Sequence, residues 1–354
     1  MESFFSRNRQ TGIYNISAHL CRFSLPQTGK DAAETSPAGQ WLWPRCWFIG
    51  RLALVNCLFL LLMSCPARAL EENLGSYVFT DLETGKKVTV WYVRPADFSA
   101  ETPIVMVLHG QRRNARSYRD AWKKYADQYG FYILVPEFSE SLFPGNAYEQ
   151  GNYFAISPLP AKKNNTYPLK NDPEEWSFHL PDKIFDDFVN KRKKSSQSTY
   201  YLYGHSAGAQ FAHRMLEIIP GPKIKMAIAA NAGWYTLPDN DESWPYGLKE
   251  AAIAPESLKN FLAFPLIILL GDKDVDSQHP DLRRTVRADR QGDNRKARGE
   301  YFYNFGYNLA VELGTPFGWR LQIVSGAGHS NREMAAAAAA LIAKDLMDSF
   351  SAYR

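Results

Sequence analysis

Cysteine is scarce in this 354-residue chain and is confined to its first part. The four cysteines are Cys21, Cys46, Cys57 and Cys65, and residues 70–354 contain none. That long region can therefore form no disulfide and no metal site built on thiolates. Hydrophobic residues make up 45% of the chain, enough for a sizeable core, which favours one large domain or two small ones.

An excess of one charge is also missing from most of the chain. The formal net charge is +4, but residues 1–69 hold seven of the 41 Lys and Arg and three of the 37 Asp and Glu, which leaves 34 of each sign in residues 70–354. Proteins that bind nucleic acid normally present a basic face, so we expect no nucleic-acid partner. The dense basic cluster at residues 191–194 is typical of the solvated end of a helix.

The N-terminal part has only a short apolar run. Residues 52–63 are mostly apolar, which is short of the length needed to span a bilayer. Two arginines come before this run, and Ala67-Arg68-Ala69 follows it. This order is typical of a secretory signal peptide that is cleaved before Leu70. We therefore predict a leader and signal peptide in residues 1–69, a separate folded domain in residues 70–354, and export to the periplasm or the medium.

A lipid anchor is an alternative outcome for this segment. Residues 62–65, Leu-Met-Ser-Cys, resemble a bacterial lipobox, and lipidation of Cys65 would make the protein a lipoprotein. In both cases we expect membrane contact only through this segment. Residues 1–44 are long for the leader of a signal peptide, and a start codon assigned too early, with the true start near residues 45–52, explains them.

The region from residue 70 onward alternates β-rich segments with segments of helical spacing. Strands are expected at residues 76–80, 87–93, 103–108, 131–135 (ended by Pro136), 200–203, 225–230, 266–270 and 320–324. Helices are expected at residues 117–129, 209–219 and 332–350. Such alternation predicts an α/β fold with a mainly parallel sheet and helices on both faces. Ligands of these sheets bind beyond the C-terminal strand ends.

One short motif falls at such an end. Gly204-His205-Ser206-Ala207-Gly208 fits G-x-S-x-G and lies between a predicted strand and a predicted helix, as the nucleophile elbow of a hydrolase requires. Side chains at 204 and 208 would crowd so tight a turn. A serine hydroxyl is a poor nucleophile without a base, so the interpretation of Ser206 depends on partners elsewhere.

The base is expected among the seven histidines. His329 lies in the Gly-rich loop between the last predicted strand and the last helix, where it can reach over the sheet. His279 is the alternative base. His179 and His213 have the sequence context of a loop residue and a helix-surface residue. His109 and His205 lie in the loop after the third predicted strand and in the G-x-S-x-G motif, and neither is expected to be the base.

An acid is needed to orient the imidazole and to stabilise its cation. Asp274 comes three residues after Gly271, at the end of a predicted strand, and is the expected acid, with Asp276 as the alternative. The order Ser206, Asp274, His329 along the chain is that of the α/β-hydrolases.

Two backbone amides are expected to form an oxyanion hole. Ala207 follows the serine and supplies one N–H. The loop at Leu108–Gln111 supplies the other, and we expect it from Gln111, with Gly110 as the alternative. His109 is expected to orient this loop by hydrogen bonding.

Residues 107–118 (VLHGQRRNARSY), 126–131 (ADQYGF) and 135–137 (VPE) resemble the polyhydroxybutyrate depolymerase and feruloyl esterase group of the α/β-hydrolase superfamily. The resemblance covers about residues 76–350. It implies hydrolysis of carboxylic esters through an acyl-enzyme, with no cofactor and no metal. The group's polymer degraders append a linker and a binding domain, and this chain ends after its last predicted helix, so we expect a small or soluble ester substrate.

Two irregular, aromatic-rich stretches, residues 137–181 and 233–264, interrupt the alternation and are candidates for one wall of a substrate pocket. Within them we expect Tyr153, Trp176 and Trp234 to be exposed and to bind an aryl or sugar group, with core packing as the alternative. A serine peptidase of the same fold would use the same residues, and a binding protein without activity is a further alternative.

Overall fold

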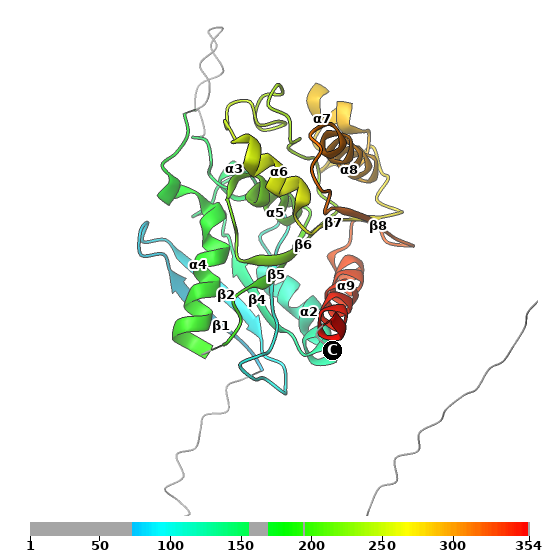
Figure 1. Cartoon of the computed structure of the whole chain (residues 1–354). Helices are drawn as coiled ribbons and strands as arrows, with labels where there is room; N and C mark the ends of the chain where they lie inside the picture. Colours follow the sequence, from blue (N-terminus) through cyan, green and yellow to red (C-terminus); the bar gives the residue numbers. More distant parts are fainter. Residues whose placement is uncertain (1–72, 156–168, 194, 353–354) are drawn as a thin grey trace, which may run out of the picture. The chain divides into compact units, whose positions relative to one another are not determined.

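The computed structural model describes residues 73–155, 169–193 and 195–352 of the chain (Figure 1). The predicted signal segment, its cleavage site before Leu70 and the alternative lipid anchor at Cys65 lie outside the described residues. Within them, no helix combines the length and the apolar composition that crossing a membrane requires.

The centre of the fold is an eight-stranded sheet in the order β1-β2-β4-β3-β5-β6-β7-β8. The strands are β1 (Leu74–Thr80), β2 (Lys87–Val93), β3 (Ile104–Leu108), β4 (Tyr132–Glu137), β5 (Tyr200–His205), β6 (Ile224–Ala230), β7 (Leu266–Gly271) and β8 (Arg320–Val324). β2 runs antiparallel to both of its neighbours, and every pairing from β4 to β8 is parallel. The predicted fold class is therefore confirmed.

Helices cover both faces of the sheet (Figure 1). They are α2 (Ala115–Tyr129), α3 (Asn146–Glu149), α4 (Leu180–Asp187), α5 (Ala207–Ile218), α6 (Pro255–Ala263), α7 (Val286–Gln291), α8 (Arg295–Glu312) and α9 (Asn331–Ala352). Side chains of α2 and α9 pack in one core cluster, and those of α4, α5, α6 and α8 pack in the other. β5 divides its residues between the two clusters, because Leu202 belongs to one and its neighbours Tyr201 and Tyr203 to the other.

One local expectation about the fold was wrong. Pro136 does not end the fourth strand, since it pairs with Val90 of β2 inside β4. β4 pairs with β3 as far as Leu134, which lies opposite Met106. Pro136 lies beyond this pair, so the N–H that proline lacks is not needed for a hydrogen bond to β3. The helix α8 was not expected, because its buried face consists largely of Arg295, Arg298 and two glycines and shows no apolar stripe.

Candidate active site

The turn at Ser206 joins the end of β5 to the start of α5 and is strained. Ser206 has φ 58° and ψ −117°, a conformation that costs free energy for any residue with a side chain. A Cβ on Gly204 would collide with the backbone of Gly208, and a Cβ on Gly208 would collide with the carbonyl of Leu108. The two glycines of the motif are therefore required by close backbone contact, and the turn lifts the serine side chain out of the sheet.

Three predicted side chains form one hydrogen-bonded chain. The Ser206 hydroxyl donates to Nε2 of His329 at 3.0 Å. Nδ1–H of His329 donates to Oδ2 of Asp274 at 2.7 Å. Asp274 is 3% exposed and follows β7, whereas His329 stands in the loop between β8 and α9. In this arrangement an imidazole can take the serine proton while a buried carboxylate balances the imidazolium charge.

The alternative residues do not join this chain. The Nδ1 atom of His279 accepts a hydrogen bond from the backbone N–H of Asp281 at 3.1 Å, and its ring centre lies 6.0 Å from that of His329. Asp276 is exposed and accepts a bond from the backbone of Gln278 at 2.9 Å. Both therefore belong to the loop that follows β7.

Arg295 is a member of the site that the sequence did not reveal. Its side chain is 2% exposed, and its guanidinium lies 3.4 Å from Oδ1 of Asp274 and 3.3 Å from Nδ1 of His279. Each oxygen of the Asp274 carboxylate thus meets a different partner. Burying a carboxylate costs free energy unless a positive or hydrogen-bonding partner accompanies it, and Arg295 is the permanent positive charge in contact with Asp274. No motif marks this residue, because it lies at the start of the unexpected helix α8.

His109 is fully buried and orients the loop after β3, as expected. Its Nε2 accepts from the N–H of Phe138 at 3.0 Å, so the remaining Nδ1–H donates to the carbonyl of Gly110 at 2.9 Å. Burial lowers the pKa of His109 to about 4, so the ring is neutral at pH 7. Because C=O and N–H point to opposite sides of a planar peptide, fixing the Gly110 carbonyl also fixes the direction of the Gln111 N–H.

The Tyr118 hydroxyl lies close to Gly110. A Cβ placed on Gly110 would lie 2.8 Å from this hydroxyl, and burial raises the pKa of Tyr118. The same hydroxyl lies 3.0 Å from Nδ1 of His205. A Cβ placed on Gly110 would lie 3.6 Å from Cβ of Ser206, so this loop passes directly beside the serine.

The serine opens into a cavity of about 540 Å³. Ser206, His329 and Gln111 are among its lining residues. The charged residues that line it are Arg112, Arg283, Arg295, Arg332, Glu149 and Asp281. Basic groups therefore outnumber acidic ones in the cavity, although the region from residue 70 onward is balanced overall.

The three aromatic residues proposed for substrate binding are not exposed as expected. Tyr153 is 2% exposed and packs against Trp176 and Trp244, with ring centres 4.6 and 5.5 Å apart. Neither Tyr153 nor Trp176 lines the cavity. Trp234 does line it, but only 2% of its surface is exposed. Irregular segments give no periodicity from which burial could be read, so the sequence could not separate these cases.

His213 was expected at the surface of a helix, and this was wrong. It is fully buried, its Nδ1–H donates to the carbonyl of Ala209 at 2.9 Å, and its Nε2 accepts from the N–H of Thr236 at 3.1 Å. Its bonds connect α5 to the segment after β6. The described residues contain no cluster of three or more His, Cys, Asp or Glu side chains with the spacing of a metal site.

Known proteins that resemble this chain are found among solved structures. A search against protein-family models finds no match, and a search of curated proteins finds none either. Among solved structures, the chain is similar to poly(aspartic acid) hydrolase-1 from Sphingomonas sp. KT-1, with 41% identity and a TM-score of 0.71 over 77% of this chain and 99% of that one.

It is also similar to a poly(3-hydroxybutyrate) depolymerase from Bordetella parapertussis, with 32% identity and a TM-score of 0.69 over 77% of this chain and 89% of that one. Both relatives are hydrolases by name, and both are covered over most of their length. The chain therefore belongs to the α/β-hydrolase superfamily, in its polyhydroxybutyrate depolymerase-like group, and is a hydrolase.

Proposed function

We propose that this hydrolase is a serine esterase that cleaves carboxylic esters through an acyl-enzyme on Ser206. The observation that carries the proposal is the continuous hydrogen-bonded chain from Ser206 through His329 to Asp274 at a cavity of about 540 Å³. The strained turn at Ser206 supports it, because strain of this kind is retained where a reactive group must be presented.

The reaction follows from the contacts of these side chains. Nε2 of His329 takes the hydroxyl proton while Oγ of Ser206 bonds to the ester carbon, and the carbonyl electron pair moves to its oxygen. When this tetrahedral intermediate collapses, the bond to the alcohol breaks and His329 gives its proton to the leaving alkoxide. Water then attacks the acyl-enzyme by the same route, which releases the acid and restores the Ser206 hydroxyl.

The oxyanion of the intermediate is proposed to bind the N–H groups of Ala207 and Gln111. Ala207 is the first residue of α5, where backbone N–H groups have no partner within the helix. Gln111 is favoured over Gly110 because His109 binds the Gly110 carbonyl and thereby fixes the direction of the Gln111 N–H. One such donor contributes a factor of about 10²–10³ in rate.

Amide hydrolysis is the second candidate. The relative with 41% identity is named for poly(aspartic acid), a chain of amide bonds. An amide would be cleaved by the same residues, with His329 giving its proton to the leaving amine instead of to an alkoxide. A serine peptidase is therefore the alternative to a serine esterase.

A small or soluble substrate is proposed in preference to a polymer. The volume of about 540 Å³ lies within the range of roughly 300–1,000 Å³ that is usual for small-molecule sites. A soluble ester would enter this cavity whole, whereas a polymer would have to lie across its mouth.

A substrate screen tests the proposed function. Purified protein would be offered acetyl, butyryl, feruloyl and 3-hydroxybutyryl esters, together with aminoacyl anilides and poly(aspartic acid), each with a Ser206→Ala control. We expect hydrolysis of at least one soluble ester that the control loses. Hydrolysis confined to the anilides or to poly(aspartic acid) would replace the esterase by the amidase, and hydrolysis that persists in Ser206→Ala would exclude the proposed mechanism.

Export is proposed on the sequence pattern of residues 45–69. N-terminal sequencing of the protein made in its native host tests it. Export by simple cleavage predicts a chain that starts at Leu70, and the lipoprotein alternative predicts a lipidated Cys65 at the start. A protein that retains residues 1–40 would contradict both.

A further inference from the structure

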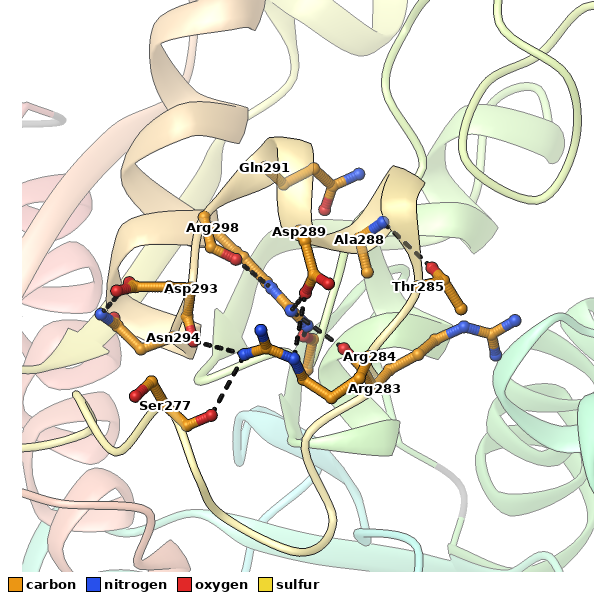
Figure 2. A network of polar contacts seen from close by, with 12 residues as sticks. Ser277, Arg283, Arg284, Thr285, Ala288, Asp289, Gln291, Asp293, Asn294 and Arg298 are labelled. Atoms are coloured by element: carbon orange, nitrogen blue, oxygen red, sulfur yellow. Dashed lines mark hydrogen bonds and ion pairs between the residues drawn. The ribbon is translucent and has the colours of Figure 1, made fainter.

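A network of polar contacts fixes residues 277–294, which we call the rim segment, beside the cavity (Figure 2). The fully buried Arg298 donates to the carbonyls of Gly233 at 2.8 Å and Arg283 at 2.9 Å and to Oδ1 of Asp289 at 3.0 Å. Arg284 donates to the carbonyl of Ser277 at 3.1 Å. The rim segment therefore has a defined backbone position although it contains little regular structure.

The side chain of Arg283 leaves this network. In Figure 2 its guanidinium extends away from the other labelled side chains and meets none of them. Its Nε–H donates to the hydroxyl of Tyr246 at 2.6 Å, and its Cζ lies 4.7 Å from the ring centre of Trp234. Both aromatic residues are buried, so they form a rigid support for one face of the guanidinium.

Among the residues that the structure describes, no hydrogen bond or ion pair occupies the two terminal nitrogens of Arg283. Within residues 73–155, 169–193 and 195–352, no carboxylate forms an ion pair with this side chain, although it lines the same cavity as Ser206. A guanidinium whose Nε is occupied still presents a pair of N–H donors that matches the two oxygens of a carboxylate. Its orientation is fixed in advance, which lowers the entropy cost of binding.

The rest of the cavity is compatible with an anion. Arg112 and Arg332 line it, are exposed, and form no ion pair in the described part of the chain. Two acidic residues, Asp281 and Glu149, line it as well. Burial raises the pKa of Glu149, against the opposing influence of Arg214, Arg113 and Arg283. The cavity thus offers more positive than negative charge to a ligand beside Ser206.

We propose that Arg283 is a specificity-determining residue that binds a carboxylate of the substrate. The enzyme then prefers esters whose acyl part carries a second, free carboxylate, that is, half-esters of dicarboxylic acids. This proposal rests on the proposed function, because it places the carboxylate in the cavity where Ser206 would attack. Trp234, which was expected to bind an aryl group, serves instead to hold Arg283.

Matched substrates separate this role from a structural one. The 4-nitrophenyl half-esters of glutaric and adipic acid would be compared with 4-nitrophenyl valerate and hexanoate, in which a methyl group replaces the carboxylate. We expect the wild type to favour the half-esters and Arg283→Gln to lower their kcat/KM by roughly 10- to 100-fold. The neutral esters should lose much less than the half-esters, because they carry no carboxylate for Arg283 to bind. A structural role would lower both classes alike.

Two further variants provide the controls. Arg283→Lys keeps the charge but not the paired donors and should recover only part of the preference. Arg290→Gln removes the same charge from α7 at an exposed residue that does not line the cavity, and it should leave the preference unchanged. A loss of preference in Arg290→Gln equal to that in Arg283→Gln would mean that general charge, and not Arg283, sets the specificity.

Binding of the free diacid gives a readout that does not depend on turnover. Calorimetry with glutarate and adipate should show binding to wild-type protein that Arg283→Gln weakens by at least about tenfold and that added NaCl weakens further. If neither diacid binds, or if both bind Arg283→Gln as tightly as wild type, the proposal for Arg283 is wrong even where ester hydrolysis is found. If the diacids bind as expected but no ester is cleaved, the proposed function fails and the carboxylate site stands.

Discussion

The serine end and the rim of the cavity use their polar groups differently. At the serine end, Ser206, His329, Asp274 and Arg295 are joined in one chain of hydrogen bonds and ion pairs. At the rim, the Arg283 side chain makes a single hydrogen bond with the described part of the chain, which leaves its terminal nitrogens without a partner there. A closed chain fixes groups in position for a reaction, whereas a supported but unpaired charge is suited to a ligand. The predictions below test this division.

Removal of the proposed base should have the largest effect. His329→Ala should lower kcat by about 10³-fold or more, because the Ser206 hydroxyl then has no proton acceptor. The neutral ester found in the screen is the substrate, and steady-state kinetics is the measurement. His279→Ala is the matched control, since His279 lines the same cavity without contacting Ser206, and it should retain most of the activity. Equal losses in the two variants would overturn the assignment of the base.

Loss of the support for the oxyanion hole should come next. His109→Ala removes the donor to the Gly110 carbonyl, so the Gln111 N–H loses its fixed direction. We expect kcat to fall by about 10²-fold, close to the effect of losing one oxyanion donor. KM should change little, because His109 does not line the cavity. A fall in kcat of less than about threefold would show that this peptide keeps its orientation without His109 and that the histidine matters only for packing.

Arg295→Leu should cost stability as well as activity. The substitution leaves the buried Asp274 carboxylate without its positive partner, and breaking a buried pair in this way typically costs about 3–5 kcal/mol. Urea unfolding measures the loss, and Arg295→Lys, which keeps the charge, should recover part of it. If Arg295→Leu unfolds like the wild type, then the contact between Arg295 and Asp274 does not contribute to stability.

Acid should destabilise the protein through its buried histidines. The pKa of His109 is lowered to about 4 in the folded state, against a usual value of 6.5. Between these two values the unfolded chain binds more protons, so stability is complete above about pH 6.5 and falls as the pH drops toward 4. One such residue removes about 3 kcal/mol by pH 4. Urea unfolding of the wild type and of His109→Gln at several pH values should show a shallower dependence for the variant.

The smallest effect is expected at Tyr153, which packs against Trp176 and Trp244 away from the cavity. Tyr153→Phe removes a hydroxyl that donates to the carbonyl of Ala251 at 3.3 Å, and it should lower the free energy of unfolding by about 1 kcal/mol. The value of kcat/KM should not change, because Tyr153 does not line the cavity. A selective loss of activity toward feruloyl esters would restore Tyr153 to the substrate site.

The parts of the fold that the sequence predicted are those with strong local signals. A continuous apolar run such as residues 266–270 forms either a buried strand or a buried helix. This run is too short for a typical helix, so a strand was predicted. Ser206, Asp274 and His329 were found because each lies within a few residues of the end of a predicted strand and close to a glycine. The structure brings these three residues together in the predicted order.

The parts that the sequence missed depend on contacts between distant residues. Arg295 and Arg298 are buried because they meet Asp274, Asp289 and several backbone carbonyls. In the sequence the same arginines indicate an exposed helix or a loop. Arg283 carries no signal of its own, because its role depends on Tyr246 and Trp234, which lie 37 and 49 positions earlier in the chain. Charged residues that act through tertiary contacts are thus the ones that local patterns do not reveal.

Covalent labelling with a fluorophosphonate shows directly whether Ser206 is the nucleophile. A fluorophosphonate reacts with a serine that is activated by a neighbouring base, and mass spectrometry of the digested protein locates the adduct. We expect one adduct, on the peptide that contains Ser206, with parallel loss of ester hydrolysis and with no labelling of His329→Ala on the same timescale. An adduct on another residue, or full hydrolytic activity in protein that is labelled at Ser206, would contradict this role of Ser206.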